Sequence, residues 1–97
     1  MATVRFFGPY TFNLASSWAP GVEGVWWWKP PTGTDFTLGT ATVSVHPPAG
    51  NRVTIAVVET RSRVNYYGSD RYLEFRLRNV GPDPSNGFVA FISLVQA

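Results

Sequence analysis

Glycine and proline divide this sequence into short intervals, the longest of them residues 51–67, and no interval has the apolar spacing of an amphipathic helix. The chain contains 9 glycines and 8 prolines, and the intervals are rich in β-branched and aromatic residues. Such intervals favour strands, so we expect short strands joined by turns. Between the first two, Gly8-Pro9 forms either a tight turn or a kink. The candidate strands span residues 3–7, 10–14, 22–29, 40–46, 53–66, 71–80 and 87–95.

Six or seven short strands in 97 residues predict an all-β fold in one domain, residues 1–97. We expect an antiparallel β-sandwich of immunoglobulin-like or jelly-roll type, with a small barrel as the competing architecture. Residues 40–46 alternate between apolar and polar positions, as a half-buried strand does. The order of the strands in the sheets stays open.

The apolar pattern changes once within residues 53–66. Val53, Ile55 and Val57 share a face, but beyond Val57 charged residues occupy the equivalent positions. An extra residue in one strand reverses the alternation, so we expect a β-bulge near Val57-Val58.

The hairpin that follows has a register in which apolar residues meet on one face and opposite charges meet on the other. Its loop is expected at residues 67–70. The expected cross-strand pairs are Tyr66–Arg71, Val64–Leu73, Arg63–Glu74, Arg61–Arg76 and Glu59–Arg78.

The strand predicted for residues 87–95 is apolar on both faces. We expect it to form the last hairpin with residues 71–80 through a turn at residues 81–86. A strand of this kind requires cover on both sides, from the second sheet and from a further surface.

The sequence offers little for catalysis. It has no cysteine and one histidine, His46, so thiolate chemistry and zinc sites of the usual spacing are excluded. Ser44 lies beside His46 without an orienting acid, and Glu59 and Glu74 are expected to pair with arginines rather than act as acid and base. We therefore expect no enzymatic activity, no metal and no cofactor.

The net charge of +2 is too small to indicate nucleic-acid binding, although six arginines fall between positions 52 and 78. We expect a solvated, ion-paired sheet face there, and no nucleic-acid partner. No apolar run reaches the length of a membrane helix or a signal peptide. The expected location is the cytoplasm, or a particle assembled in the cytoplasm.

Three consecutive tryptophans, Trp26, Trp27 and Trp28, form the most unusual stretch. Neighbours on a strand alternate, so Trp27 points one way and the other two point the opposite way. We expect Trp27 to fill the core. Trp26 and Trp28 then lie at the surface, or pack under the loop at residues 15–21 or under the proline-rich turn. The candidate interface or sugar-binding residues are Trp18, Trp26, Trp28, Tyr66, Tyr67 and Phe91.

Two functions fit these residues. The first is protein–protein assembly, most simply a homo-oligomer, because the tryptophans and the two-faced last strand both call for extra burial. The alternative is a carbohydrate-binding, lectin-like module in which Trp26 and Trp28 form an aromatic platform for a sugar ring. Of the two we favour assembly.

Overall fold

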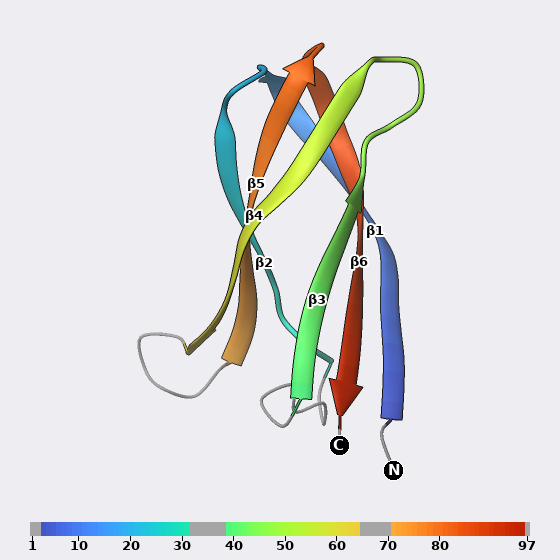
Figure 1. Cartoon of the computed structure of the whole chain (residues 1–97), viewed down its shortest axis with the longest axis vertical. Coiled ribbons are helices and arrows are strands. Elements are labelled where there is room, and N and C mark those ends of the chain that lie inside the picture. Colours follow the sequence, from blue (N-terminus) through green and yellow to red (C-terminus); the bar gives the residue numbers. More distant parts are fainter. Residues whose placement is uncertain (1–2, 32–38, 65–70, 97) are drawn as a thin grey trace.

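Two three-stranded antiparallel sheets pack face to face, and together they form a sandwich rather than a closed barrel (Figure 1). The computed structural model describes residues 3–31, 39–64 and 71–96. Sheet A has the order β1-β6-β3 and sheet B has the order β2-β5-β4. The six strands are β1 (Thr3–Trp18), β2 (Glu23–Trp28), β3 (Gly39–His46), β4 (Val53–Val64), β5 (Arg71–Pro82) and β6 (Ser85–Gln96).

The first two predicted strands are one strand of 16 residues. Gly8-Pro9 makes a kink, and the pairing of β1 with β6 is irregular between Phe7 and Tyr10. Gly8 has a φ of +118°, and a Cβ there would lie 2.9 Å from the carbonyl oxygen of Ala90. Only glycine accommodates both conditions without strain. The irregularity lets Phe7 and Tyr10 both pack against the core although their positions differ in parity.

The β-bulge predicted at Val57-Val58 is confirmed, because the register of β4 on β5 shifts between Val57 and Glu59. The predicted register of this hairpin is wrong by two residues. A slip of two residues keeps every side chain on its own face and changes only its partner, so the apolar pattern fits both registers equally well. The observed pairs include Val64–Arg71, Ser62–Leu73, Arg61–Glu74 and Glu59–Arg76. The predicted partner Tyr66 lies outside the described residues.

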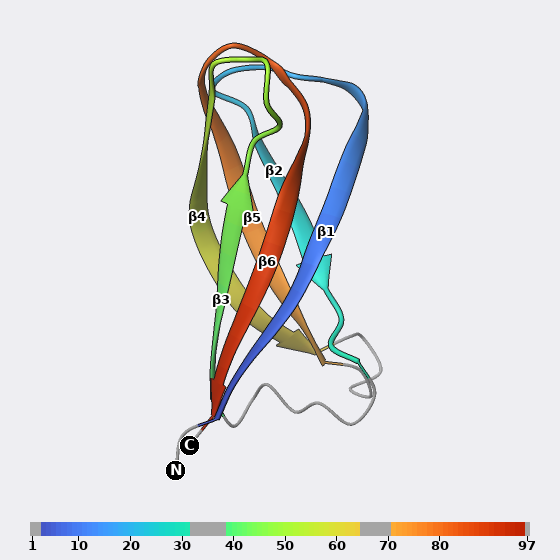
Figure 2. The same cartoon turned by 90° about the vertical axis from the view of Figure 1, so that its right-hand side faces the viewer.

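The predicted last hairpin is also wrong. β5 lies at the centre of sheet B and β6 at the centre of sheet A, so the chain crosses from one sheet to the other between them. Figure 2 shows this connection passing over one end of the sandwich. Each of these central strands pairs instead with two strands of its own sheet, β6 with β1 and β3, and β5 with β2 and β4.

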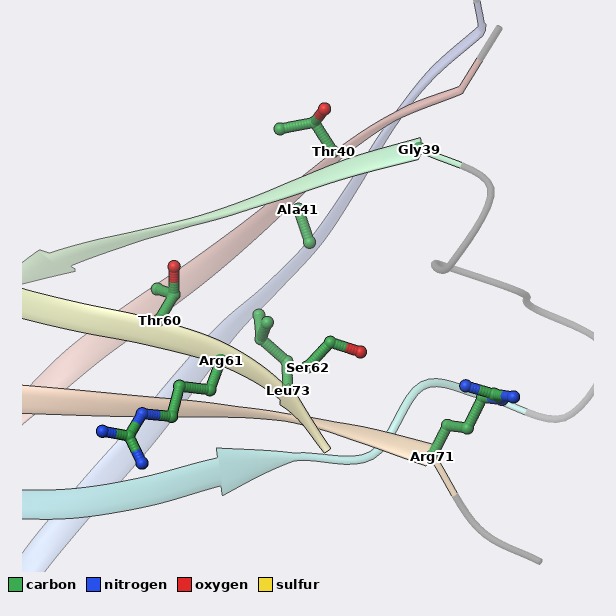
Figure 3. A pocket seen from close by; sticks show the side chains of 8 residues that line it. All are labelled: Gly39, Thr40, Ala41, Thr60, Arg61, Ser62, Arg71 and Leu73. Atoms are coloured by element: carbon green, nitrogen blue, oxygen red, sulfur yellow. The ribbon is translucent and has the colours of Figure 1, made fainter. Parts of the chain in front are cut away.

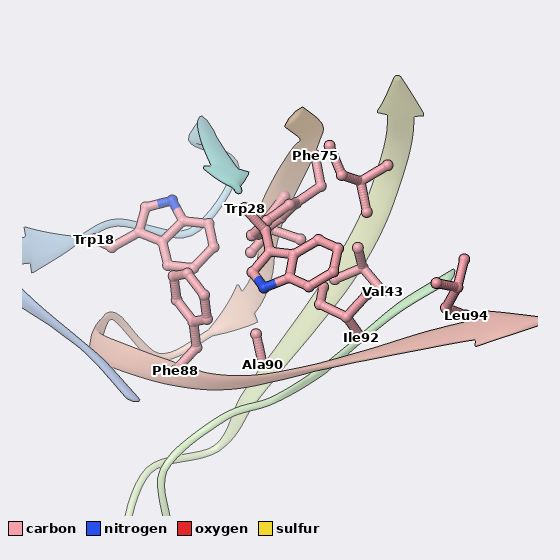
Figure 4. Close-up of a cluster of buried hydrophobic side chains, with 10 residues drawn as sticks. Trp18, Trp28, Val43, Phe75, Phe88, Ala90, Ile92 and Leu94 are labelled. Carbon is pink, nitrogen blue, oxygen red and sulfur yellow. The ribbon is translucent and has the colours of Figure 1, made fainter. Parts of the chain in front are cut away.

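The core lies between the central strands of the two sheets (Figure 4). Phe88 is the hub of an aromatic cluster: its ring stacks on Phe12 at 4.7 Å and meets the edge of Trp26 at 4.8 Å. Such pairs stabilise a core beyond the area they bury. The buried apolar side chains of the described residues are Trp18, Trp28, Val43, Leu73, Phe75, Leu77, Phe88, Ala90, Ile92 and Leu94.

One buried polar side chain ties the crossover to the β1–β2 turn. Asn79 is fully buried, and its Nδ2 donates to the carbonyl oxygens of Trp18 at 2.8 Å and of Asp83 at 3.1 Å. Its Oδ1 accepts the backbone N–H of Gly81 at 2.8 Å. All three bonds satisfy backbone groups that turns would otherwise leave unpaired.

Asp83, at the crossover, also holds the start of β4. Its carboxylate accepts the backbone N–H of Arg52 at 2.9 Å and lies 3.4 Å from the Arg52 guanidinium. The backbone hydrogen bond from Arg52 is the main cause that holds the pKa of Asp83 below its usual value, and the guanidinium adds to it. The lowered pKa means that the ionised form stabilises the fold above the unfolded-state pKa, and that this contribution is lost as pH falls through the folded-state pKa.

We expect Asp83→Asn to melt at a lower temperature than the natural sequence at pH 7, because the amide keeps the hydrogen bond but loses the charge. The difference should be small, about 5 °C or less, since the pair is at the surface. It should begin to shrink as the pH falls below about 4, the usual pKa of an Asp side chain, and should vanish once the pH passes below the lowered pKa of Asp83, where the natural carboxylate is also protonated. Thermal melts from pH 2.5 to 7 measure this, and a difference that stays constant with pH would show that the charge of Asp83 plays no part.

Candidate functional site

The tryptophan run lies opposite to the predicted orientation. Trp28 is buried, Trp26 is half-buried and Trp27 is 66% exposed, so the prediction that Trp27 fills the core is wrong. The cause is the pairing of β2 with β5, in which Trp26 and Trp28 lie opposite the core residues Phe75 and Leu73. Directly opposite residues of an antiparallel pair share a face, so both indoles point inward.

The predicted platform of Trp26 and Trp28 is therefore not on the surface. The Trp28 ring lies 5.0 Å from Phe7, and its Nε1 donates to the hydroxyl of Tyr10 at 3.1 Å. Trp18 is buried as well, and its Nε1 donates to the carbonyl oxygen of Val22 at 2.8 Å. Figure 4 shows Trp18 and Trp28 within the core cluster. Of the other candidates, Phe91 is half-buried, and Tyr66 and Tyr67 lie outside the described residues.

Trp26 reaches the wall of a cavity of about 370 Å³ formed by residues 14–19 and 22–24. The prediction of a loop at residues 15–21 is wrong for residues 15–18, which form the end of β1. Its ring folds back over Gly24, where an added Cβ would lie 2.5 Å from the indole. The absence of a side chain at position 24 is what gives Trp26 this position.

Among the residues that the structure describes, the outer face of sheet A, called here the neutral face, carries no Asp, Glu, Lys or Arg. Phe6 is 76% exposed on it, and Val4 and Val95 are also exposed. Arg5, the basic residue of β1, pairs with Leu94 and has its guanidinium over the Phe7 ring, on the other side of the strand. The neutral face consists of Val4, Phe6, Thr11, Asn13, Thr40, Thr42, Ser44, His46, Val89, Phe91, Ser93 and Val95.

The two faces of β6 match the double apolar pattern of its sequence. Its inner side chains are buried against sheet B, whereas Val89 and Phe91 on the neutral face are half-buried and Val95 is exposed. Phe91 lies opposite Ser44 of β3 and meets the ring of His46 edge-on at 5.6 Å. The outward-facing side chains of this central strand are thus less covered than its inward-facing side chains.

The outer face of sheet B, called here the charged face, is different in kind. Trp27 lies on it opposite Glu74, which in turn lies opposite Arg61 of β4. Glu59 accepts a hydrogen bond from Nε of Arg61 at 2.7 Å and lies 3.7 Å from Arg76. The charged face consists of Glu23, Val25, Trp27, Ala56, Glu59, Arg61, Tyr72, Glu74, Arg76 and Arg78.

The ion pairs of the charged face shift the pKa values of Glu59 and Arg61. The hydrogen bond from Arg61 is the largest cause that lowers the pKa of Glu59, and the charges of Arg61 and Arg76 add to it. Reciprocally, Glu59 raises the pKa of Arg61, with a smaller contribution from Glu74. Arg61 is thus close to both carboxylates, and the face is an ion-paired surface of the kind expected from the sequence.

A polar cavity of about 390 Å³ opens between β3 and β4 (Figure 3). Its lining residues include Thr40, Thr60 and Ser62, but the Thr40 side chain points to the other side of β3 from Ala41, and the side chains of Arg61 and Arg71 extend in different directions. Among the residues that the structure describes, its lining includes no histidine and no carboxylate.

Within the described ranges, no three His, Cys, Asp or Glu side chains gather as metal ligands would. The same residues form no helix of the length and apolarity that a membrane crossing requires.

The fold and its surfaces define a two-sheet β-sandwich with one neutral outer face and one charged outer face bearing an exposed tryptophan. Comparisons of the chain with models of known families, with characterised proteins and with solved structures found no match in any of the three.

Proposed function

We propose that this domain is a non-catalytic assembly module that self-associates through the neutral face. The observation that carries the proposal is the lack of Asp, Glu, Lys and Arg among the described residues of that face, together with the exposure of Phe6, Val4 and Val95. The centres of protein interfaces are depleted in charged residues and enriched in aromatic ones. A contiguous face of this kind differs from isolated surface valines, which need no explanation.

A second copy of the chain is the partner that the chemistry of the face favours. In a two-fold contact each surface meets itself, so any charge on it would be brought close to its own copy. The neutral face escapes this repulsion. The hydroxyls of Thr40, Thr42 and Ser44 on β3 border the apolar residues, and they can hydrogen-bond across such a contact or to trapped water.

The test compares lysine substitutions on the two faces. We expect the natural chain to have an oligomeric mass, and Phe6→Lys to weaken association by about 30-fold or more, because a charge would be buried at the contact. Phe6 is 76% exposed, so the fold itself should tolerate the change. Light scattering over a concentration series measures the mass, and thermal melts report folding.

Val25→Lys is the matched control, because Val25 is an exposed apolar residue on the charged face. It should leave the mass unchanged, and Phe91→Lys, at the centre of the neutral face, should dissociate the oligomer as Phe6→Lys does. A natural chain that stays at 10.7 kDa over the whole series would refute self-association. Dissociation by Val25→Lys alone would move the interface to the other sheet.

A further inference from the structure

The aromatic residues of the charged face form an exposed corner. Trp27 lies on the edge strand β2 and is 66% exposed, whereas its neighbour Trp28 is buried. The ring of Tyr72 lies 6.5 Å from the Trp27 ring, at an interplanar angle of 63°. This edge-to-face contact braces the indole from one side.

Planar hydrogen-bonding groups lie directly beside this indole. Across the sheet, Trp27 is followed by Glu74 and then by Arg61, at the strand spacing of about 4.8 Å. In the neighbouring row, Val25 is followed by Arg76 and then by Glu59. An aromatic plane is thus bordered by carboxylates and guanidinium groups.

We infer that the corner of Trp27 and Tyr72 is a binding site for a neutral sugar ring. A pyranose has an apolar C–H face that stacks on an indole, and its rim of hydroxyls both donates and accepts hydrogen bonds. Glu74 can accept from two neighbouring hydroxyls, and Arg61 can donate to ring or hydroxyl oxygens. This arrangement thus supplies both a stacking surface for the apolar face of the sugar and hydrogen-bonding partners for its hydroxyls.

The charge of the face selects a neutral ligand. Three acids, Glu23, Glu59 and Glu74, are interspersed with three bases on the three rows that cross the sheet from β2; the bases are Arg61, Arg76 and Arg78. A phosphate backbone would meet carboxylates among the arginines. A second copy of the chain would have to remove these ions from water, which is costly unless every one of them finds a partner. A polyhydroxylated ring instead leaves the ion pairs in place and hydrogen-bonds to the carboxylates and guanidinium groups that form them.

The inference does not depend on the proposed function. The sugar site lies on sheet B and the neutral face on sheet A, so a neutral-face variant that dissociates the oligomer should keep its sugar affinity. A sugar-site variant should keep its mass.

The experiment begins with the full chain on an array of neutral oligosaccharides that includes gluco-, xylo-, manno-, galacto- and N-acetylglucosamine series. The best binder is then titrated by calorimetry against the natural chain, Trp27→Ala and Glu74→Gln. We expect Trp27→Ala to lose affinity by 10-fold or more, and Glu74→Gln to lose affinity by a smaller factor. Acrylamide quenching adds a second readout, because the bound sugar should shield the exposed Trp27 indole.

Phe6→Ala is the matched control, since it removes an exposed aromatic ring from the neutral face and should leave sugar affinity unchanged. Equal loss in Phe6→Ala and Trp27→Ala would overturn the site. So would the absence of any neutral glycan retained by the natural chain. Retention of only an anionic polysaccharide such as heparin, abolished by 0.5 M salt, would assign the face to charge rather than to stacking, and would also overturn it.

Discussion

Asn79→Asp should destabilise the fold by about 3–5 kcal/mol, although it replaces only one NH₂ group by oxygen. The natural amide donates to the carbonyl oxygens of Trp18 and Asp83 and accepts from the N–H of Gly81. A carboxylate can only accept, so two carbonyl oxygens would face a buried negative charge. For a domain of this size the loss corresponds to a melting temperature lower by about 15–30 °C.

Urea unfolding followed by circular dichroism measures this loss. Asn86→Asp is the control, because Asn86 is exposed on β6, the next strand in the chain. The control should change stability by less than about 0.5 kcal/mol. The deficit of Asn79→Asp should shrink in acid, where the protonated carboxyl regains one donor. A variant as stable as the natural chain at pH 7 would mean that Asn79 does not bridge the β1–β2 turn and the crossover.

Trp28→Ser should lower the free energy of unfolding far more than Trp27→Ser, although the two residues are adjacent. The difference should amount to most of the stability of the domain. Trp28 is 8% exposed and packs against Phe7 and Tyr10, so its removal leaves a large cavity in the core. Replacing a buried tryptophan by a small residue costs about 3–5 kcal/mol. Trp27 is 66% exposed, and its replacement should cost less than about 1 kcal/mol.

Chemical denaturation of the two variants, side by side, gives the answer directly. Trp28→Ser should be largely unfolded or strongly shifted to low denaturant, and Trp27→Ser should unfold near the natural midpoint. The reverse order would place Trp27 in the core, as the sequence-based prediction had it. Loss of assembly in a Trp28 variant therefore reports unfolding, so the interface test belongs to Phe6 and Phe91.

The strands and the bulge were predictable because both follow from local alternation. Each strand face shows a period of two, and the break at Val57-Val58 is visible without any knowledge of the partner strand. The two-faced pattern of residues 87–95 likewise predicted a strand needing cover on both sides, and β6 lies at the centre of sheet A with its outer half only partly covered.

The site residues were harder to predict, because alternation says that Trp27 opposes Trp26 and Trp28 but not which set points inward. That choice is made by the partner strand, through the pairing of Trp28 with Leu73 and of Trp26 with Phe75. The Trp27–Tyr72 corner arises from the same register, and Asn79 acquires its role only where the β1–β2 turn meets the crossover. No short-range signal in the sequence marks either.

From the sequence alone came the all-β class, the strand positions to within a few residues, the bulge and the existence of two opposed sets of tryptophans. Only the tertiary structure decided that β5 and β6 lie in different sheets, that the β4–β5 register is two residues from the expected one, and that Trp27 is at the surface. The physical reason is that side-chain alternation repeats every two residues. Any arrangement that preserves the faces satisfies the pattern, and only packing between the sheets distinguishes among those arrangements.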